Sequence, residues 1–427
     1  MSKKVSTNNE GKTDKINSVI KKITGTGAEE CRDILLLLLS MTAVYAVVWS
    51  FVGIGNNPYN SYVLQAVAWC KGHLDLGRDY SHLEIAFFNG KYYLSFPPMP
   101  SVIYLPFALI WGENLPEELI ALITAYLGGI YAKKIAGFFG ADGKKSVFWA
   151  LFVTVGSNLL LLSVNAWVWF IAQSMSFTFA VMSIYYALKN RGALSMTFWA
   201  CAVGCRPFQI VMFPVIVWIL YKNHEPMKPV EVLKRRLDWL LPAVVIGVIY
   251  MALNYARFGN VMEFGHKYLP EFVNLDTGMF NGKEYLAQNI KNMFRFPGIN
   301  SNGTLDYPKF NGMNIFMSSP VFIAGVIYPV MYFIKKIGMK EKPGNIVLCI
   351  IVPLMIAAEL LCIASKNNMG GFQFGCRYTV DVLPMTFLYI MMTKPDNKNA
   401  DYCFLPVFVF GLALNVLGTV MLYRNYL

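Results

Sequence analysis

Charged residues are scarce in this chain of 427 residues: Asp, Glu, Lys and Arg make up 15% of it, whereas 56% of its residues are hydrophobic. A soluble domain carries about 25% charged residues, so the chain has too few charges to cover a water-facing surface of its size. The hydrophobic residues also come in long blocks. Because about 20 apolar residues cross the hydrocarbon core of a bilayer as a helix, the composition predicts many membrane-spanning helices.

The chain also lacks a cysteine framework, although it has eight cysteines. Cysteine beside apolar blocks acts as a small hydrophobic residue, and this applies to Cys31, Cys201, Cys205, Cys349, Cys362 and Cys403. Cys70 and Cys376 are expected outside the membrane, where the sequence allows one disulfide between them. No spacing of Cys and His matches a metal site. The sequence therefore indicates no cofactor, and it leaves a divalent metal open.

The net charge of +12 does not indicate nucleic-acid binding, because of where the charges lie. Lys and Arg gather in short segments between apolar blocks, as they do in cytoplasmic loops, and no basic stripe with interleaved aromatic residues is present. Residues 1–33 are polar and lysine-rich, without the apolar core of a signal peptide. We expect a cytoplasmic N-terminal tail, membrane lipids around the remainder of the chain, and no nucleic-acid partner.

The apolar blocks of residues 34–427 predict an all-α polytopic fold with about eleven spans, in which nearly all Lys pairs fall on the cytoplasmic side. The spans are 34–54, 119–135, 147–163, 167–188, 193–204, 207–221, 239–255, 316–334, 346–364, 378–392 and 402–423. The block 101–111 is too short to cross and is expected to lie in the membrane interface. Residues 55–100 and 257–314 are then two large extracytoplasmic loops.

The first of these loops holds a dense group of ionisable side chains within residues 75–100: Asp75, Arg78, Asp79, His82, Glu84 and Lys91. Asn89-Gly90 is a strong hairpin signal, so 84–88 and 91–96 are expected to pair as a short ribbon. An ordinary solvated loop would have a similar composition. Acids and aromatic rings concentrated beside the interface, in a chain short of charge, favour a functional site.

Four motifs follow one another along the chain. The first loop ends in Phe96-Pro97-Pro98, the next motif is Cys205-Arg206-Pro207, and two longer stretches are 253–265 (LNYARFGNVMEFG) and 370–384 (GGFQFGCRYTVDVLP). This series resembles the GT-C membrane glycosyltransferases, and within them the bacterial protein mannosyltransferase and aminoarabinose transferase branch. The resemblance implies inverting transfer of a sugar from a polyprenyl-phosphate donor to a glycan, lipid or protein acceptor outside the cell membrane.

The implied chemistry needs a carboxylate that takes or orients the proton of an acceptor hydroxyl. Many relatives carry an Asp directly after the first span, but this chain has Asn57-Pro58-Tyr59-Asn60 there. The acid must then come from further along the loop. We predict Asp79 first and Glu84 second as catalytic residues, and we expect Asp75 to be structural.

The departing phosphate needs cations, because negative charge develops on it. The candidates are Arg377, Arg257 and Arg206 near outer helix ends, and Lys91 in the first loop. Arg377 follows a glycine-rich loop, and Asp381, four residues later, is expected to hold it on one helical face. An arginine that merely snorkels to the interface would occupy the same place. His82, Glu359 and Lys267 are supporting candidates, with His266 beside the last.

Two other functions stay open. A transporter or flippase for a lipid-linked or small polar solute would need acids inside the membrane, for which Glu359 and Asp381 are the candidates. An inactive relative that binds a lipid-linked glycan would account for the missing early Asp. A transferase needs an acid in the loop, so the position of the essential acid separates these classes.

Overall fold

The computed structural model describes residues 27–54, 57–80, 83–224, 226–270, 272, 280–299, 301, 305–306, 308, 310–395 and 400–424. Among these residues, seven helices have the length and hydropathy to cross a membrane. They are α2 (Ala28–Val52), α5 (Glu117–Phe138), α8 (Val168–Leu188), α12 (Leu237–Phe258), α15 (Val321–Gly338), α16 (Ile346–Ala364) and α18 (Leu405–Tyr423), which follows η5 (Asp401–Phe404). The helical membrane fold is confirmed.

Shorter helices occupy the other expected spans. They are α6 (Lys144–Val153) with α7 (Leu159–Ser163), α9 (Gly192–Cys205), η2 (Pro207–Met212) with α10 (Phe213–Lys222), and η4 (Arg377–Val382) with α17 (Leu383–Thr393). Each lies where the sequence predicted a crossing, although two of them begin with a 3₁₀ helix and residues 154–158 separate α6 from α7. The total of eleven spans therefore stays a prediction.

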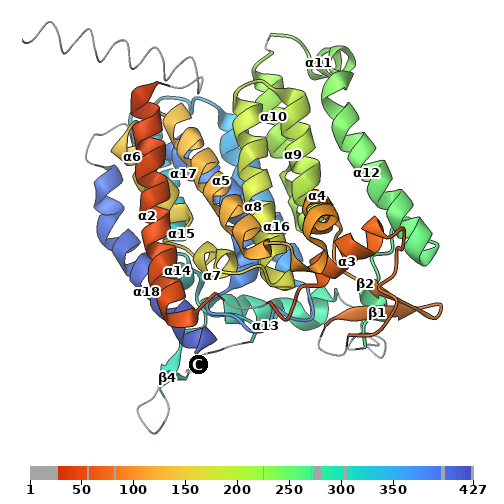
Figure 1. Cartoon of the computed structure of the whole chain (residues 1–427). Coiled ribbons are helices and arrows are strands. Elements are labelled where there is room, and N and C mark those ends of the chain that lie inside the picture. Colours follow the sequence, from red (N-terminus) through yellow and green to blue (C-terminus); the bar gives the residue numbers. More distant parts are fainter. Residues whose placement is uncertain are drawn as a thin grey trace, which may run out of the picture.

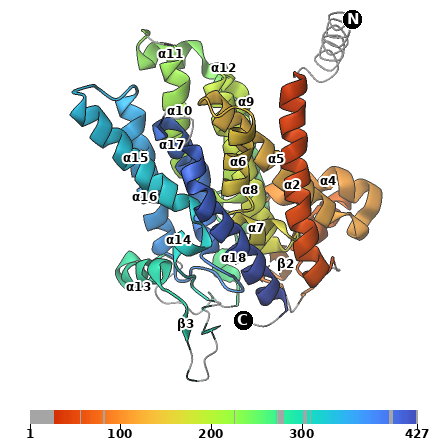
Figure 2. The same ribbon diagram turned by 90° about the vertical axis from the view of Figure 1, so that its left-hand side faces the viewer.

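The long helices lie side by side, and their connections gather at two ends of the bundle (Figures 1 and 2). The start of α2 and α11 (Pro229–Arg235) lie at one end. The opposite end, called the site end below, holds α3 (Ser61–Cys70), η1 (Gly112–Asn114), η3 (His266–Tyr268), α13 (Gly282–Phe294), α14 (Ile315–Ser318) and two hairpins. The orientation of these ends relative to the cytoplasm stays a prediction.

The first hairpin forms where the sequence predicted it. Strand β1 (Ile85–Phe88) pairs antiparallel with β2 (Lys91–Leu94), and Phe88 lies opposite Lys91. The two turn residues have positive φ, 49° at Asn89 and 75° at Gly90, as a tight two-residue hairpin turn requires. The second hairpin, β3 (Gly298–Ile299) with β4 (Leu305–Asp306), is shorter.

Helix α4 (Met99–Trp111) lies across the direction of the long helices, below the bundle's middle (Figures 1 and 2). Its final turn leaves Leu109 and Ile110 exposed by 72% and 70%. Exposed aliphatic side chains at the end of a crosswise helix fit the interfacial position expected from the sequence.

Helix α8 is the central helix of the bundle, with 83% of its apolar stretch buried. It packs closely on α5 because Gly128 has no side chain: a Cβ there would lie 2.7 Å from Thr178 Oγ1. Small residues at such contacts allow membrane helices to approach closely. The hydroxyl of Thr178 donates to the carbonyl oxygen of Thr124 at 2.9 Å, so the contact is also hydrogen-bonded.

The disulfide that the sequence allowed between Cys70 and Cys376 does not form, since both thiols are free. Cys70 ends α3, where its Sγ lies 3.9 Å from the carbonyl oxygen of Leu105. Cys376 is buried before η4, and a Cβ on Gly312 would lie 3.0 Å from its Sγ. The two cysteines are therefore packed against different parts of the fold.

Candidate active site

A cavity of about 720 Å³ lies at the site end and is called the site cavity below. All four sequence motifs contribute to its lining. The polar lining residues are Tyr62, Glu84, Arg206, Glu263, His266, Lys267, Lys366, Asn368, Arg377 and Tyr378. Segments far apart in the chain therefore meet around one space of the size that small-molecule sites usually have.

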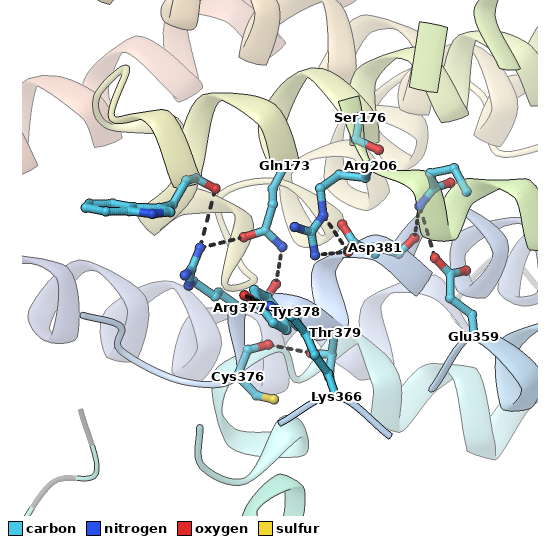
Figure 3. Close-up of polar contacts among 12 residues, drawn as sticks. Gln173, Ser176, Arg206, Glu359, Lys366, Cys376, Arg377, Tyr378, Thr379 and Asp381 are labelled. Atoms are coloured by element: carbon cyan, nitrogen blue, oxygen red, sulfur yellow. Dashed lines mark hydrogen bonds and ion pairs between the residues drawn. The ribbon is translucent and has the colours of Figure 1, made fainter. Parts of the chain in front are cut away.

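Arg377 lies in the wall of this cavity with only 5% of its surface exposed. Its Nη1 donates weakly to two atoms of α8, the carbonyl oxygen of Trp169 at 3.4 Å and Oε1 of Gln173 at 3.3 Å (Figure 3). Its Nε is buried without a partner, and among the described residues no carboxylate lies within ion-pair distance of it. Within the described part of the chain, Arg377 is therefore a desolvated cation that lacks a direct counter-charge.

The loop before η4 makes room for this guanidinium. Gly370 has a φ of 93°, and a Cβ on it would lie 2.8 Å from Arg377 Nε. Glycine is the residue that adopts this conformation without strain and lets the backbone approach so closely. The glycine-rich stretch of the motif thus places backbone against the arginine.

We expected Asp381 to hold Arg377, but in the structure Asp381 pairs with Arg206 instead. The Nε and Nη2 atoms of Arg206 lie 2.9 Å and 2.8 Å from Oδ2 of Asp381 (Figure 3). The expectation assumed an α-helix, in which residues four apart share a face. Arg377–Val382 is instead a 3₁₀ helix, where residues three apart align and the fourth points elsewhere.

Tyr378 lies at the centre of the positive charge. The guanidinium carbons of Arg206 and Arg377 lie 4.8 Å and 4.9 Å from its ring centroid, and Lys366 Nζ lies 5.0 Å from it. The Lys366 ammonium also donates to the Tyr378 hydroxyl at 3.2 Å (Figure 3). The ring face attracts cations, and it holds three of them beside the cavity.

Of the residues that the structure describes, two carboxylates line the cavity. Glu84, half-buried just before β1, is close enough to act electrostatically on Arg377. Glu263 forms an ion pair with Lys267, with 2.6 Å between Oε2 and Nζ. Asp79, the first catalytic candidate from the sequence, is exposed and lies outside the lining. Of the two predicted catalytic acids, the structure brings Glu84 to the cations.

Two of the predicted phosphate ligands also lie outside the lining. Lys91 is exposed on β2, 3.8 Å from Asp75. Arg257 is buried at the end of α12, where it donates to the carbonyl oxygen of Leu94 at 3.0 Å and to Asn254 Oδ1 at 2.9 Å. Its guanidinium thus ties α12 to the first hairpin.

Two supporting candidates are placed as follows. Glu359 is fully buried in α16, where its Oε1 accepts a hydrogen bond from Gln209 Nε2 at 3.2 Å. The same amide donates to the carbonyl oxygen of Asp381 at 2.7 Å. His82 lies outside the described residues. Glu359 therefore belongs to the buried network behind Arg206, rather than to the lining of the cavity (Figure 3).

Sequence reasoning missed Lys366 and Tyr378, although a signal was available. The triplet Gly-Cys-Arg occurs at 204–206 and again at 375–377. Each copy leads into a six-residue 3₁₀ helix and then a helix with Pro in its first turn. The structure brings the two copies together, and Tyr378 directly follows the second arginine.

No family model and no curated protein matches the sequence. The similar solved structures include the apo oligosaccharyltransferase of Archaeoglobus fulgidus, and AglB of the same organism in complex with an inhibitory peptide and a dolichol-phosphate. Each has a TM-score of 0.43 and 11% identity, covering 91% of this chain and 56% of the other. A similarity of this size identifies neither the family nor the function of the chain.

Proposed function

We propose that the chain is a membrane glycosyltransferase that moves a sugar from a polyprenyl-phosphate donor to a hydroxyl of a glycan, lipid or protein acceptor, with inversion. The observation that carries the proposal is Arg377, a buried cation in the wall of a large cavity that has no direct counter-charge among the residues the structure describes. A desolvated arginine is costly unless an anion binds to it. The resemblance of the four sequence motifs points to the same class of reaction.

The phosphate of the donor fits the side of the cavity where the cations meet. Arg206 is already neutralised by Asp381, which leaves Arg377 and Lys366 as the charges available to a ligand. Planar guanidinium groups suit phosphate oxygens. Fixed cations also stabilise the charge that grows on a leaving phosphate, so the same residues serve binding and catalysis.

The sugar fits the aromatic part of the lining, which includes Trp169, Phe208, Phe272 and Phe310. Rings offer flat apolar faces to the C–H groups of a sugar, and they leave its hydroxyls to the polar residues. The polyprenyl chain then packs against the apolar surfaces of the membrane helices beside the cavity. We infer that the site end faces the extracytoplasmic side.

Glu84 is the acid that we assign to the acceptor. Its carboxylate takes the proton of the acceptor hydroxyl while the hydroxyl oxygen attacks the anomeric carbon. The bond from that carbon to the phosphate oxygen breaks, and its electron pair stays on the polyprenyl phosphate near Arg377 and Lys366. Glu84 lines the cavity, whereas Asp79 does not, which reverses their order as candidates.

The test is sugar transfer by purified, reconstituted protein. Polyprenyl-phosphate sugars serve as donors, and an alkyl glycoside, a serine peptide and water serve as acceptors. We expect Glu84→Gln to lower release of polyprenyl phosphate at least 100-fold, an effect of the size expected for loss of a general base, and Asp79→Asn to leave it nearly unchanged.

The same preparation tests the transport alternative. If the wild type turns over no donor in the panel, and Glu359→Gln alone changes the movement of lipid-linked or polar solutes across the vesicle bilayer, the transferase proposal is wrong. Loss of transfer in both Asp79→Asn and Glu84→Gln would instead show that the assignment of the acid to one position is wrong.

A further inference from the structure

His266 has a fixed position in the site cavity. It begins η3 and lines the cavity together with residues of the motif segments 205–207 and 370–384. Its ring packs edge-on against Phe96, with centroids 5.8 Å apart and planes at 87°, and lies nearly parallel to Phe272 at 6.2 Å. Two aromatic contacts thus restrict the orientation of the imidazole.

A hydrogen bond also decides which ring nitrogen carries the proton. Nδ1 of His266 lies 2.9 Å from the backbone carbonyl oxygen of Ser95. A carbonyl oxygen only accepts, so Nδ1 must donate, and in a neutral imidazole Nε2 then keeps a free lone pair. Among the described residues, no hydrogen-bond partner contacts Nε2.

The surroundings keep this ring neutral. Burial and the charges of Lys366 and Arg206 oppose its protonation, whereas Glu263 favours it but is already paired with Lys267. Together they lower the pKa of His266 to about 4. At neutral pH, the site cavity therefore contains an oriented hydrogen-bond acceptor beside a group of cationic donors.

We propose that His266 binds the acceptor substrate, with Nε2 accepting a hydrogen bond from a hydroxyl or amide N–H group of the acceptor that neighbours the hydroxyl attacking the sugar. The inference rests on the proposed function and adds the residue that positions the nucleophile. Arg206, Arg377 and Lys366 only donate hydrogen bonds, which suits phosphate. The attacking hydroxyl gives its single proton to Glu84, so a neighbouring donor group of the acceptor needs a separate hydrogen-bond acceptor, which Nε2 supplies.

His266 gains no charge in this assignment. Its hydrogen bond holds the acceptor molecule in place, while the proton of the attacking hydroxyl passes to Glu84 as the new glycosidic bond forms. The effect of His266 should therefore appear in the use of the acceptor, while binding of the donor, which depends on the cations, should not change.

Two substitutions separate this role from a purely structural one. The amide of His266→Asn can reach the position of Nδ1 and donate to Ser95, but it offers nothing at the position of Nε2. The amide of His266→Gln reaches the position of Nε2 and offers an oxygen there, but it loses the bond to Ser95. The pair thus removes one ring nitrogen at a time.

The experiment measures KM for the donor and for the alkyl glycoside or serine peptide that the wild type glycosylates. We expect His266→Asn to raise the KM of the acceptor about tenfold, the usual effect of losing one hydrogen bond. The KM of the donor should stay within twofold. His266→Gln should retain more acceptor affinity than His266→Asn.

The opposite ranking would overturn the inference. If His266→Gln raises the KM of both substrates and lowers the melting temperature, while His266→Asn behaves as the wild type, the histidine only holds the segment at Ser95. If the wild type transfers sugar and His266→Asn has the same acceptor KM as the wild type, this inference is wrong and the proposed function stands. If the wild type turns over no donor, both the proposed function and this inference are wrong.

Discussion

Arg206 and Asp381 form a buried ion pair, with 2.8 Å between Nη2 and Oδ2, although 175 residues separate them in the chain. The pair joins Arg206, which follows α9, to Asp381 in η4. The carboxylate of Asp381, which we expected to hold Arg377, is therefore taken up by Arg206. One arginine of the two is thus neutralised by the fold, and the other is left for a ligand.

The stability of this pair can be measured. Replacing Asp381 by Asn leaves the Arg206 guanidinium, which is 17% exposed, without its counter-charge. Breaking a buried pair from one side costs about 3 kcal/mol, so Asp381→Asn should lower the unfolding free energy in detergent by about that amount. The double variant Arg206→Gln/Asp381→Asn should recover part of the loss, and strictly additive effects of the two changes would contradict the pairing.

Arg377 should behave differently from Arg206. Because its guanidinium is buried and has no carboxylate partner among the described residues, replacing it by Gln should leave thermal stability unchanged or higher. Sugar transfer should fall about 100-fold or more, the effect of removing one group that stabilises developing charge. Lys91→Gln is the matched control, since Lys91 is exposed and outside the lining; a similar loss of transfer in both variants would point to a general charge effect.

Gly370 should resist substitution because of both its backbone and its neighbour. Its φ of 93° is strained for alanine, and a Cβ would lie 2.8 Å from Arg377 Nε. We expect Gly370→Ala to reduce transfer at least tenfold, mainly through weaker donor binding. Gly344 is the control, because an added Cβ there would meet no atom of the described residues within 4 Å. Equal activity of Gly370→Ala and Gly344→Ala would show that the approach to Arg377 is dispensable.

Acidification should weaken the fold through His266. Its pKa of about 4 in the folded protein lies below its ordinary value near 6.5, so between these values the unfolded chain binds more protons. Neutral His266 contributes about 3 kcal/mol to the free energy of unfolding. This contribution is complete above about pH 6.5 and is lost as the pH falls to about 4. The difference in unfolding free energy between wild type and His266→Asn measures it. A difference that stays constant or grows on acidification would rule this out.

The sequence by itself determined the class of the protein and its local elements. Long apolar blocks dictate membrane helices because an unpaired backbone is too costly in lipid, and Asn89-Gly90 dictates the turn between β1 and β2. It also marked Arg206, Arg377 and Glu84 as candidates, because these short motifs are contiguous in the chain.

Only the tertiary structure decided which of these side chains meet. Whether Asp381 faces Arg206 or Arg377 depends on the 3₁₀ geometry of η4 and on the packing of α9 beside it. Asp79 and Glu84 are five positions apart, yet only Glu84 lines the cavity. Local patterns follow from hydrophobicity and backbone preference, whereas contacts between charges depend on how distant helices pack, which no single segment of the sequence specifies.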